Sequence, residues 1–307
     1  MAVDALLLVL SFALGSVLSR LSLCAVAGVQ QLIGARDGSG AQRLALAASA
    51  AGATLLLLAL ALPGRVLLPG HAPFHAGIIG GGLLLGVGAL LNGGCYLGSV
   101  LYLGCGNLNF LFTLAGIACG SRWTESVTAR MSTVGALRVS MGSLPLAGLA
   151  VFALVLLVLL GRRRLEGRWL AAAAGLLGGL VYARHPGWSY GAVLESLTHG
   201  ALGAMDWLGN LSALLLFAGA LAGAWLRGRF RLLRPSWPRS LRCLAGGMVM
   251  GCGAVQVPGG NDMLLLWAIP GLTNYGLLAY ASMLAAIGAG VAAAALWQRN
   301  RRPGTVN

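Results

Sequence analysis

Charged residues are scarce in this sequence. They make up 9% of its 307 residues, whereas soluble domains carry about 25%. Apolar runs that are long enough, or nearly so, to cross a bilayer core of about 30 Å lie at residues 44–62, 144–160, 208–226 and 276–297. A soluble protein is thereby excluded. The sequence predicts an all-α polytopic membrane protein, with residues 1–307 as one membrane domain of about eight or nine spanning or half-spanning elements.

Lysine is absent, so all 21 basic residues are arginine. The net charge of +14 would suggest a nucleic-acid partner in a soluble protein. Here the arginines gather in short runs between apolar segments, at residues 36–43, 162–168, 227–242 and 299–302. This is the positive-inside pattern, so we expect these loops and the C-terminus in the cytoplasm and the N-terminus outside. We expect no nucleic-acid partner.

The N-terminus lacks the basic cluster of a cleaved signal peptide, because its first charged side chain is Asp4. We interpret it as the start of the first membrane helix.

The pattern C-x-x-C is also missing. The six cysteines all lie within or beside apolar segments, in a spacing that is poor for a zinc site or a thiol–disulfide motif; they are Cys24, Cys95, Cys105, Cys119, Cys243 and Cys252. We therefore expect no metal, no cofactor and no enzymatic activity.

Glycine, in contrast, is abundant, and its positions reveal a repeat. The segment "GGLLLGVGALLNGGCY" (81–96) matches "GGMVMGCGAVQVPGGN" (246–261) at an offset of 165. The segment "GSVLSR", which ends at Arg20, resembles "GLVYAR", which ends at Arg184, at an offset of 164. Two matches at nearly one offset indicate an internal duplication.

The two copies have opposite predicted topology. Gly81 follows an external loop, whereas Gly246 follows an arginine-rich internal loop. Inverted repeats with broken helices near the membrane midplane are typical of transporters. We predict one repeat at 1–141 and the other at 169–302, joined by a connecting helix and a cytoplasmic arginine loop at 142–168.

The stretch "LLNGGCYLGSVLYLGCGNLN" (90–109) combines glycines, cysteines and asparagines in an apolar chain. We predict a broken helix hairpin that lines a narrow pore, because glycines permit a bend and non-helical backbone survives in a membrane only where protein or water satisfies it. Asn92 and Asn107 would satisfy the freed backbone, and Cys95 would face the substrate.

Two further features could carry chemistry. Arg20 and Cys24 are four residues apart, which on a continuous helix places them on one face; Arg20 is either functional or at a helix end, where it snorkels. Asp262 forms a polar cluster with Asn261 and Gln256, which is either part of a pathway or a solvated loop tip.

The motifs "GSVLSRLSLCAVAG", "GGLLLGVGALLNGGCYLG" with "LGCGNLNFL", and "GGMVMGCGAV" with "PGGN" resemble the YeeE/YedE family of sulfur or thiosulfate transporters. The resemblance covers roughly 10–120 and 175–290. It implies a bacterial inner-membrane protein whose inverted halves are pinched together at the midplane, where cysteine thiols pass thiosulfate along. Carried over to this chain, those thiols are Cys24 and Cys95.

The last block departs from the family pattern. The family has a third cysteine there, and the matching position is Gly260. Cys252 lies eight residues earlier, Cys105 stands where other members often lack a cysteine, and the acid Asp262 lies beside the gap.

The resemblance implies uptake of a small inorganic sulfur anion, thiosulfate or a related oxyanion. One alternative is a membrane sulfur-relay subunit that works with a cytoplasmic TusA-like sulfurtransferase, and another is a channel or carrier for a different solute with Asp262 as a proton or cation site. The expected pathway residues are Arg20, Cys24, Asn92, Gly93, Gly94, Cys95, Cys105, Asn107, Cys252, Gly259, Gly260, Asn261 and Asp262.

Overall fold

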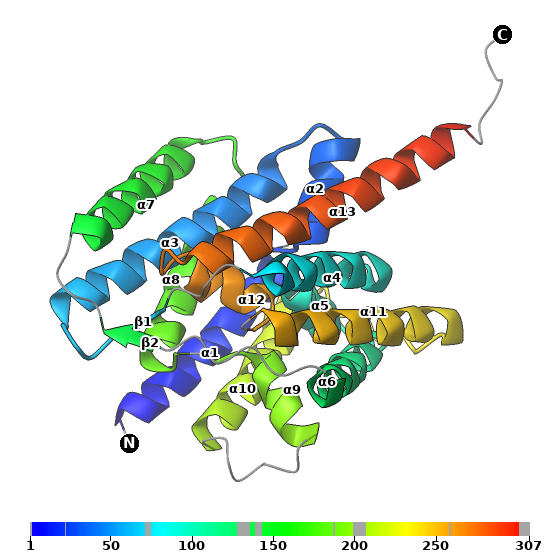
Figure 1. The fold of residues 1–307 in the computed structure, drawn as a ribbon, viewed down its shortest axis with the longest axis horizontal. Helices are drawn as coiled ribbons and strands as arrows, with labels where there is room; N and C mark the ends of the chain where they lie inside the picture. The colour runs from blue at the N-terminus through cyan, green and yellow to red at the C-terminus, as the bar shows by residue number, and fades with distance from the viewer. Residues whose placement is uncertain are drawn as a thin grey trace.

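The chain folds almost entirely into helices, as its computed structural model shows (Figure 1). The structure describes residues 2–21, 23–70, 75–127, 136–138, 143–186, 188–198, 207–257 and 259–300. Within these residues, five helical segments are long and apolar enough to cross a membrane, or six if a pair bent by 54° counts as one span. The predicted all-α polytopic membrane protein is therefore confirmed. One small addition was not predicted, an antiparallel pair of strands, β1 (Leu67–Pro69) and β2 (Ala136–Arg138).

The chain contains two runs of elements in the same order. Within each run, a pattern of a long helix, a break, a short helix and a long helix occurs twice. The first run comprises α1 (Ala2–Arg20), α2 (Ala25–Gly34), α3 (Ser39–Ala61), α4 (Ala76–Asn92), α5 (Tyr96–Gly104) and α6 (Phe110–Val127). The second comprises α8 (Arg168–Arg184), α9 (Tyr190–Thr198), α10 (Trp207–Trp225), α11 (Trp237–Gln256), α12 (Asn261–Met263) with the π-helix η1 (Leu264–Ala268), and α13 (Asn274–Asn300). The helix α7 (Ser143–Gly161) lies between them in sequence.

The contacts between these helices are also paired. Helix α1 packs on α10 and α8 packs on α3, while α6 packs on α11 and α13 packs on α4. If each helix is replaced by its equivalent in the other run, the α1–α10 contact becomes the α8–α3 contact, and the α6–α11 contact becomes the α13–α4 contact. Two halves related by a pseudo-two-fold axis produce this pattern, so it supports the predicted repeats at 1–141 and 169–302, which remain a prediction.

Helices α4 and α11 cross each other in close contact, through glycine. A Cβ atom on Gly88 would lie 2.7 Å from the carbonyl oxygen of Gly246, and one on Gly253 would lie 2.6 Å from that of Gly81. The offset of 165 carries Gly81 to Gly246 and Gly88 to Gly253, so it converts one contact into the other. Early residues of one helix meet late residues of the other, which makes the helices antiparallel. Small residues permit this close approach of two backbones within a membrane.

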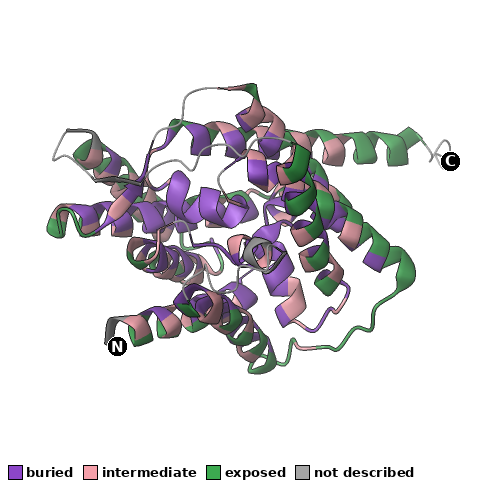
Figure 2. Ribbon diagram, turned by 60° about the horizontal axis from the view of Figure 1, so that its bottom comes forward, coloured by how far each residue is buried: buried purple, intermediate pink, exposed green. Residues whose placement is uncertain are grey.

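Exposed residues lie along the outer sides of the helices (Figure 2). Large apolar side chains face outward along the helices, such as Leu157 and Leu214, which are 69% and 67% exposed. Exposed tryptophans lie near helix ends, as Trp207 and Trp225 do at the two ends of α10. Tryptophan is enriched at both membrane–water interfaces, so these positions agree with spanning helices.

Helix α7 lies at the edge of the bundle, against α3 (Figure 1). The ring of Phe152 fills the space that the missing side chain of Gly52 leaves on α3. The connecting helix therefore packs outside the two runs of elements and leaves their shared centre untouched.

The glycine crossing predicts the effect of one added methyl group. In Gly246→Ala, the Cβ atom would lie 2.5 Å from the backbone nitrogen of Asn92 and 2.8 Å from the carbonyl oxygen of Gly88. Because backbone cannot yield as a flexible side chain does, we expect the free energy of unfolding to fall by about 1–3 kcal/mol. Thermal unfolding of the purified protein in detergent measures this change.

The matched control is Gly288→Ala on α13, where no atom lies within 4 Å of the added carbon. There we expect unchanged or higher stability, by up to about 1 kcal/mol, because alanine is the better helix former. Equal melting temperatures for both variants would show that the α4–α11 crossing tolerates side chains.

Candidate functional site

Each short helix begins immediately after a break in a longer span. The residues that precede these helices are Cys24, Cys95, Ser189 and Gly260. The offset of 165 relates Cys24 to Ser189 and Cys95 to Gly260, so the four breaks occupy equivalent places in the two runs of elements. The structure therefore places Cys24 and Cys95, the two cysteines that the resemblance singles out, at the starts of α2 and α5.

The two cysteine thiols meet. Their sulfur atoms lie 3.7 Å apart, and the thiol of Cys95 donates a hydrogen bond to Cys24. Both residues are 1% exposed. All six cysteines lie in the described part of the chain, and none forms a disulfide. A Cβ atom on Gly98 would lie 2.8 Å from the sulfur of Cys24, so the absence of a side chain there makes room for the pair.

This arrangement can hold a polarisable anion. A thiol is a weak hydrogen-bond donor and a soft contact for sulfur, and burying it costs little free energy. The starts of α2 and α5 add backbone N–H groups and the positive end of each helix dipole, both of which favour negative charge. The thiols of Cys24 and Cys95 lie beside the first-turn backbone of these helices.

Tyr96, the first residue of α5, lies between the starts of α9 and α12. A Cβ atom on Gly260 would lie 2.5 Å from its ring, and one on Gly191 would lie 2.9 Å from it. The hydroxyl of Tyr190 donates a 2.9 Å hydrogen bond to the backbone carbonyl of Tyr96. The ring thus closes the space beside Gly260, so a cysteine side chain fits there only if Tyr96 moves.

Asn92 satisfies the backbone that the break after α4 sets free. Its amide donates hydrogen bonds to the carbonyl of Gly94 at 2.6 Å and to the hydroxyl of Ser99 at 3.1 Å. Its oxygen accepts a 2.6 Å hydrogen bond from Thr113 on α6. Gly93 ends α4 with a φ of 76°, which glycine adopts at little cost.

The predicted hairpin at 90–109 therefore needs a correction. Helices α4 and α5 together form one broken span of 29 residues, Ala76–Gly104, and the chain reverses only afterwards, before α6. Cys105 lies at that reversal, half-buried and about 15 Å along α5 from Cys95, given a rise of about 1.5 Å per residue. It is not part of the thiol pair.

Asn107 lies at the same reversal and stabilises the turn. Its side-chain oxygen accepts hydrogen bonds from the backbone and the amide of Asn109 at 3.3 and 2.9 Å. Asn109 in turn accepts hydrogen bonds from Ser236 and Ser240, both at 3.0 Å. These bonds attach the turn to the start of α11, at the far end of α5 from Cys95.

The predicted residues of the second half divide into two groups. Gly259, with a φ of 80°, and Gly260 form the break before α12, and the buried Asn261 and Asp262 begin that helix. Cys252 lies elsewhere, because its thiol faces the carbonyl of Gly120 on α6 at 3.5 Å.

The expected shared face of Arg20 and Cys24 is wrong. Helix α1 ends at Arg20, and Cys24 follows the break in extended conformation, so the four-residue spacing of a continuous helix does not apply. Arg20 is half-buried. Arg184, at the equivalent helix end, forms a 3.0 Å ion pair with Asp4.

Sequence reasoning missed two residues that shape this centre. The first is Ser189, whose hydroxyl accepts hydrogen bonds from the backbone of Gly191 and Ala192 at 3.1 and 3.3 Å and so caps α9. Adding the repeat offset of 165 to Cys24 would have found it. The second is Tyr96, which follows Cys95 directly and carried no signal beyond that position.

Comparison with known families agrees with this geometry. Residues 20–161 match the family described as sulphur transport, and this range contains both thiols of the pair. No curated protein matches the chain. The match over residues 20–161 supports membership of the YeeE/YedE family, which the motifs of the chain resemble.

Proposed function

We propose that this protein carries thiosulfate or a related sulfur oxyanion into the bacterial cytoplasm, along the thiols of Cys24 and Cys95. The observation that carries the proposal is the buried pair of thiols, 3.7 Å apart, at the starts of two half-helices. The match of residues 20–161 to a sulphur transport family supports a sulfur compound as the substrate.

The chemistry of the pair suits a conducting site. The hydrogen bond from Cys95 to Cys24 would be exchanged for hydrogen bonds to the terminal sulfur of the anion as it passes. A site for conduction must bind its ligand and also release it. Neutral thiols bind an anion less tightly than an arginine would, so the anion can be released again. The anion forms only hydrogen bonds to the thiols in this proposal and crosses without chemical change.

A cavity beside the break after α4 would serve as one mouth of this path. It encloses about 340 Å³, and its lining includes Asn92, Gly93, Arg239 and Arg242. Gly93 is two residues from Cys95, and both arginines are exposed at the start of α11. Their charge would draw an anion to this mouth.

The position equivalent to Arg242 in the first run carries no charge. The offset of 165 relates Arg242 to Gly77, and the nearest polar side chains there are those of His75 and Gln256. The arginine-rich loops assign the charged mouth to the cytoplasm, with the N-terminus in the periplasm. A positive inner mouth would attract the anion as it leaves the pathway on the cytoplasmic side.

The alternative of a direct sulfur relay to a TusA-like sulfurtransferase finds less support. Such a transfer needs a thiol that a docked protein can reach, and Cys24 and Cys95 are each only 1% exposed.

The first test removes one thiol. In Cys95→Ala, the anion loses its contact at the narrowest point, and we expect thiosulfate uptake into liposomes to fall at least about tenfold, which corresponds to about 1.4 kcal/mol in the barrier. The matched control is Cys119→Ala, which removes an exposed thiol from α6 and should leave uptake unchanged. Normal uptake by a correctly folded Cys95→Ala protein would exclude the thiol path.

The second test concerns the charged mouth. When thiosulfate is added on the side of this mouth, we expect Arg239→Gln and Arg242→Gln each to lower kcat/KM several-fold at low ionic strength. The loss should shrink at high salt because mobile ions screen exposed charges. Arg299→Gln, near the end of α13, removes an exposed charge far from this cavity and serves as the control. A loss of equal size in all three variants would contradict a specific role of this mouth.

A further inference from the structure

A group of buried polar atoms without hydrogen-bond partners surrounds the break before α12. Within the described residues, these atoms are the hydroxyls of Tyr96 and Tyr182, both side-chain polar atoms of Asn261, Oδ1 of Asp262 and Nε1 of Trp267. All five residues are at least nine-tenths buried. Buried polar groups in proteins are normally hydrogen-bonded, so several unpartnered ones near one break indicate that something else is bound there.

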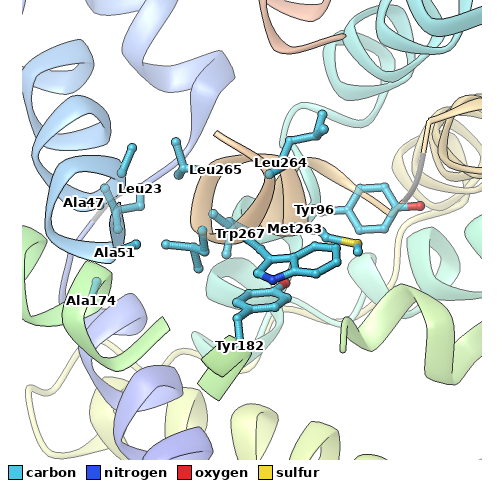
Figure 3. Packing of buried hydrophobic residues seen from close by; sticks show 14 of the residues in the cluster. Leu23, Ala47, Ala51, Tyr96, Ala174, Tyr182, Met263, Leu264, Leu265 and Trp267 are labelled. Atoms are coloured by element: carbon cyan, nitrogen blue, oxygen red, sulfur yellow. The ribbon is translucent and has the colours of Figure 1, made fainter. Parts of the chain in front are cut away.

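Contacts hold these residues together around Gly260. A Cβ atom on Gly260 would lie 2.8 Å from Oδ1 of Asp262 and 2.5 Å from the ring of Tyr96. The ring of Tyr182 stacks on that of Trp267, with centroids 6.2 Å apart (Figure 3). The break therefore brings residues from α5, α8, α12 and η1 to one place.

Asp262 has no cationic partner there. It is 3% exposed, and among the residues that the structure describes no basic side chain forms an ion pair with it. Arg184, the cation at the end of α8, is already paired with Asp4. The titratable groups that face Asp262 from the neighbouring helices are the phenols of Tyr96, Tyr182 and Tyr190.

An ionised carboxylate in such a place is costly, because neither lipid nor phenols supply a positive charge. This free-energy cost is removed only when a cation or a proton neutralises the carboxylate. The group does contain other oxygen atoms, but Asp262 is its one carboxylate, and among the described residues no three His, Cys, Asp or Glu side chains gather in a way that could hold a metal ion. Two of its members, Nε1 of Trp267 and the amide nitrogen of Asn261, can only donate and so cannot be ligands of a cation. A protonated carboxyl needs just one acceptor, and the side-chain oxygen of Asn261 is an unpartnered acceptor on the adjacent residue.

We propose that Asp262 is a proton-binding site and that its proton crosses the membrane together with the sulfur anion. This inference rests on the proposed transport function and adds its energy coupling. A divalent anion that enters a cell is opposed by the negative interior, and each proton that accompanies it cancels one of its charges. The carboxyl would also stop repelling the anion once it is protonated.

The coupling test uses the full chain in liposomes that contain a pH-sensitive dye. Adding thiosulfate outside should acidify the interior in the wild type. For each coupled proton, the equilibrium accumulation of thiosulfate should rise about tenfold for each pH unit by which the outside is more acidic, since one pH unit is a tenfold change in proton activity. Asp262→Asn should abolish both the acidification and the dependence on the pH gradient.

The control is Asp37→Asn, which alters an exposed carboxylate in the loop before α3 and should behave as the wild type. Asp262→Glu keeps a titratable group, so its pH profile should shift while coupling persists. Uptake that ignores the pH gradient, uptake driven by a sodium gradient at equal pH, or the same pH dependence in Asp262→Asn would each overturn the proposal.

A second measurement needs no transport. Infrared difference spectra of the purified protein during a pH titration should contain a carboxylic-acid C=O band that is present in Asp37→Asn and missing in Asp262→Asn. The lack of such a band in the wild type would overturn the assignment of the proton to Asp262. Failure to transport thiosulfate with the band present would instead count against the proposed substrate and leave the proton site supported.

Discussion

Every break in a membrane-spanning helix frees backbone N–H and C=O groups that lipid cannot satisfy. The described part of the chain contains four such breaks, and the fold places them together in its interior, away from the bilayer. Asn92 supplies side-chain hydrogen bonds at one break and Ser189 at another. The glycine crossing of α4 and α11 then brings the two runs of elements close enough for the breaks to meet.

The two runs share a scaffold but differ in chemistry. The position equivalent to Cys24 in the second run is a serine, Ser189, and the position equivalent to Cys95 is a glycine, Gly260. Of these four break positions, only the two in the first run therefore carry thiols. The second run carries the carboxyl of Asp262 next to its glycine break. Under our proposals the first run contacts the anion and the second binds the proton. A duplicated scaffold permits this division, because each half can change its break residues while the helix packing stays the same.

The sequence predicted those features that rest on composition and periodicity. Apolar runs, arginine loops and the offset of 165 indicated the membrane class and the paired glycine segments. The shared helical face of Arg20 and Cys24 failed, because no signal between them marks where the helix breaks. The position of Tyr96 over Gly260 could not be predicted either, since it depends on two breaks, 165 residues apart, meeting in space.

The central claim is that a sulfur anion passes between the thiols of Cys24 and Cys95. The most direct test is a crystal structure with selenosulfate, in which selenium replaces the terminal sulfur and its anomalous scattering marks the bound anion. We expect the selenium peak beside the two thiols, with their sulfur atoms moved apart from their 3.7 Å separation. A peak elsewhere in the protein, with the thiol pair undisturbed, would contradict the account.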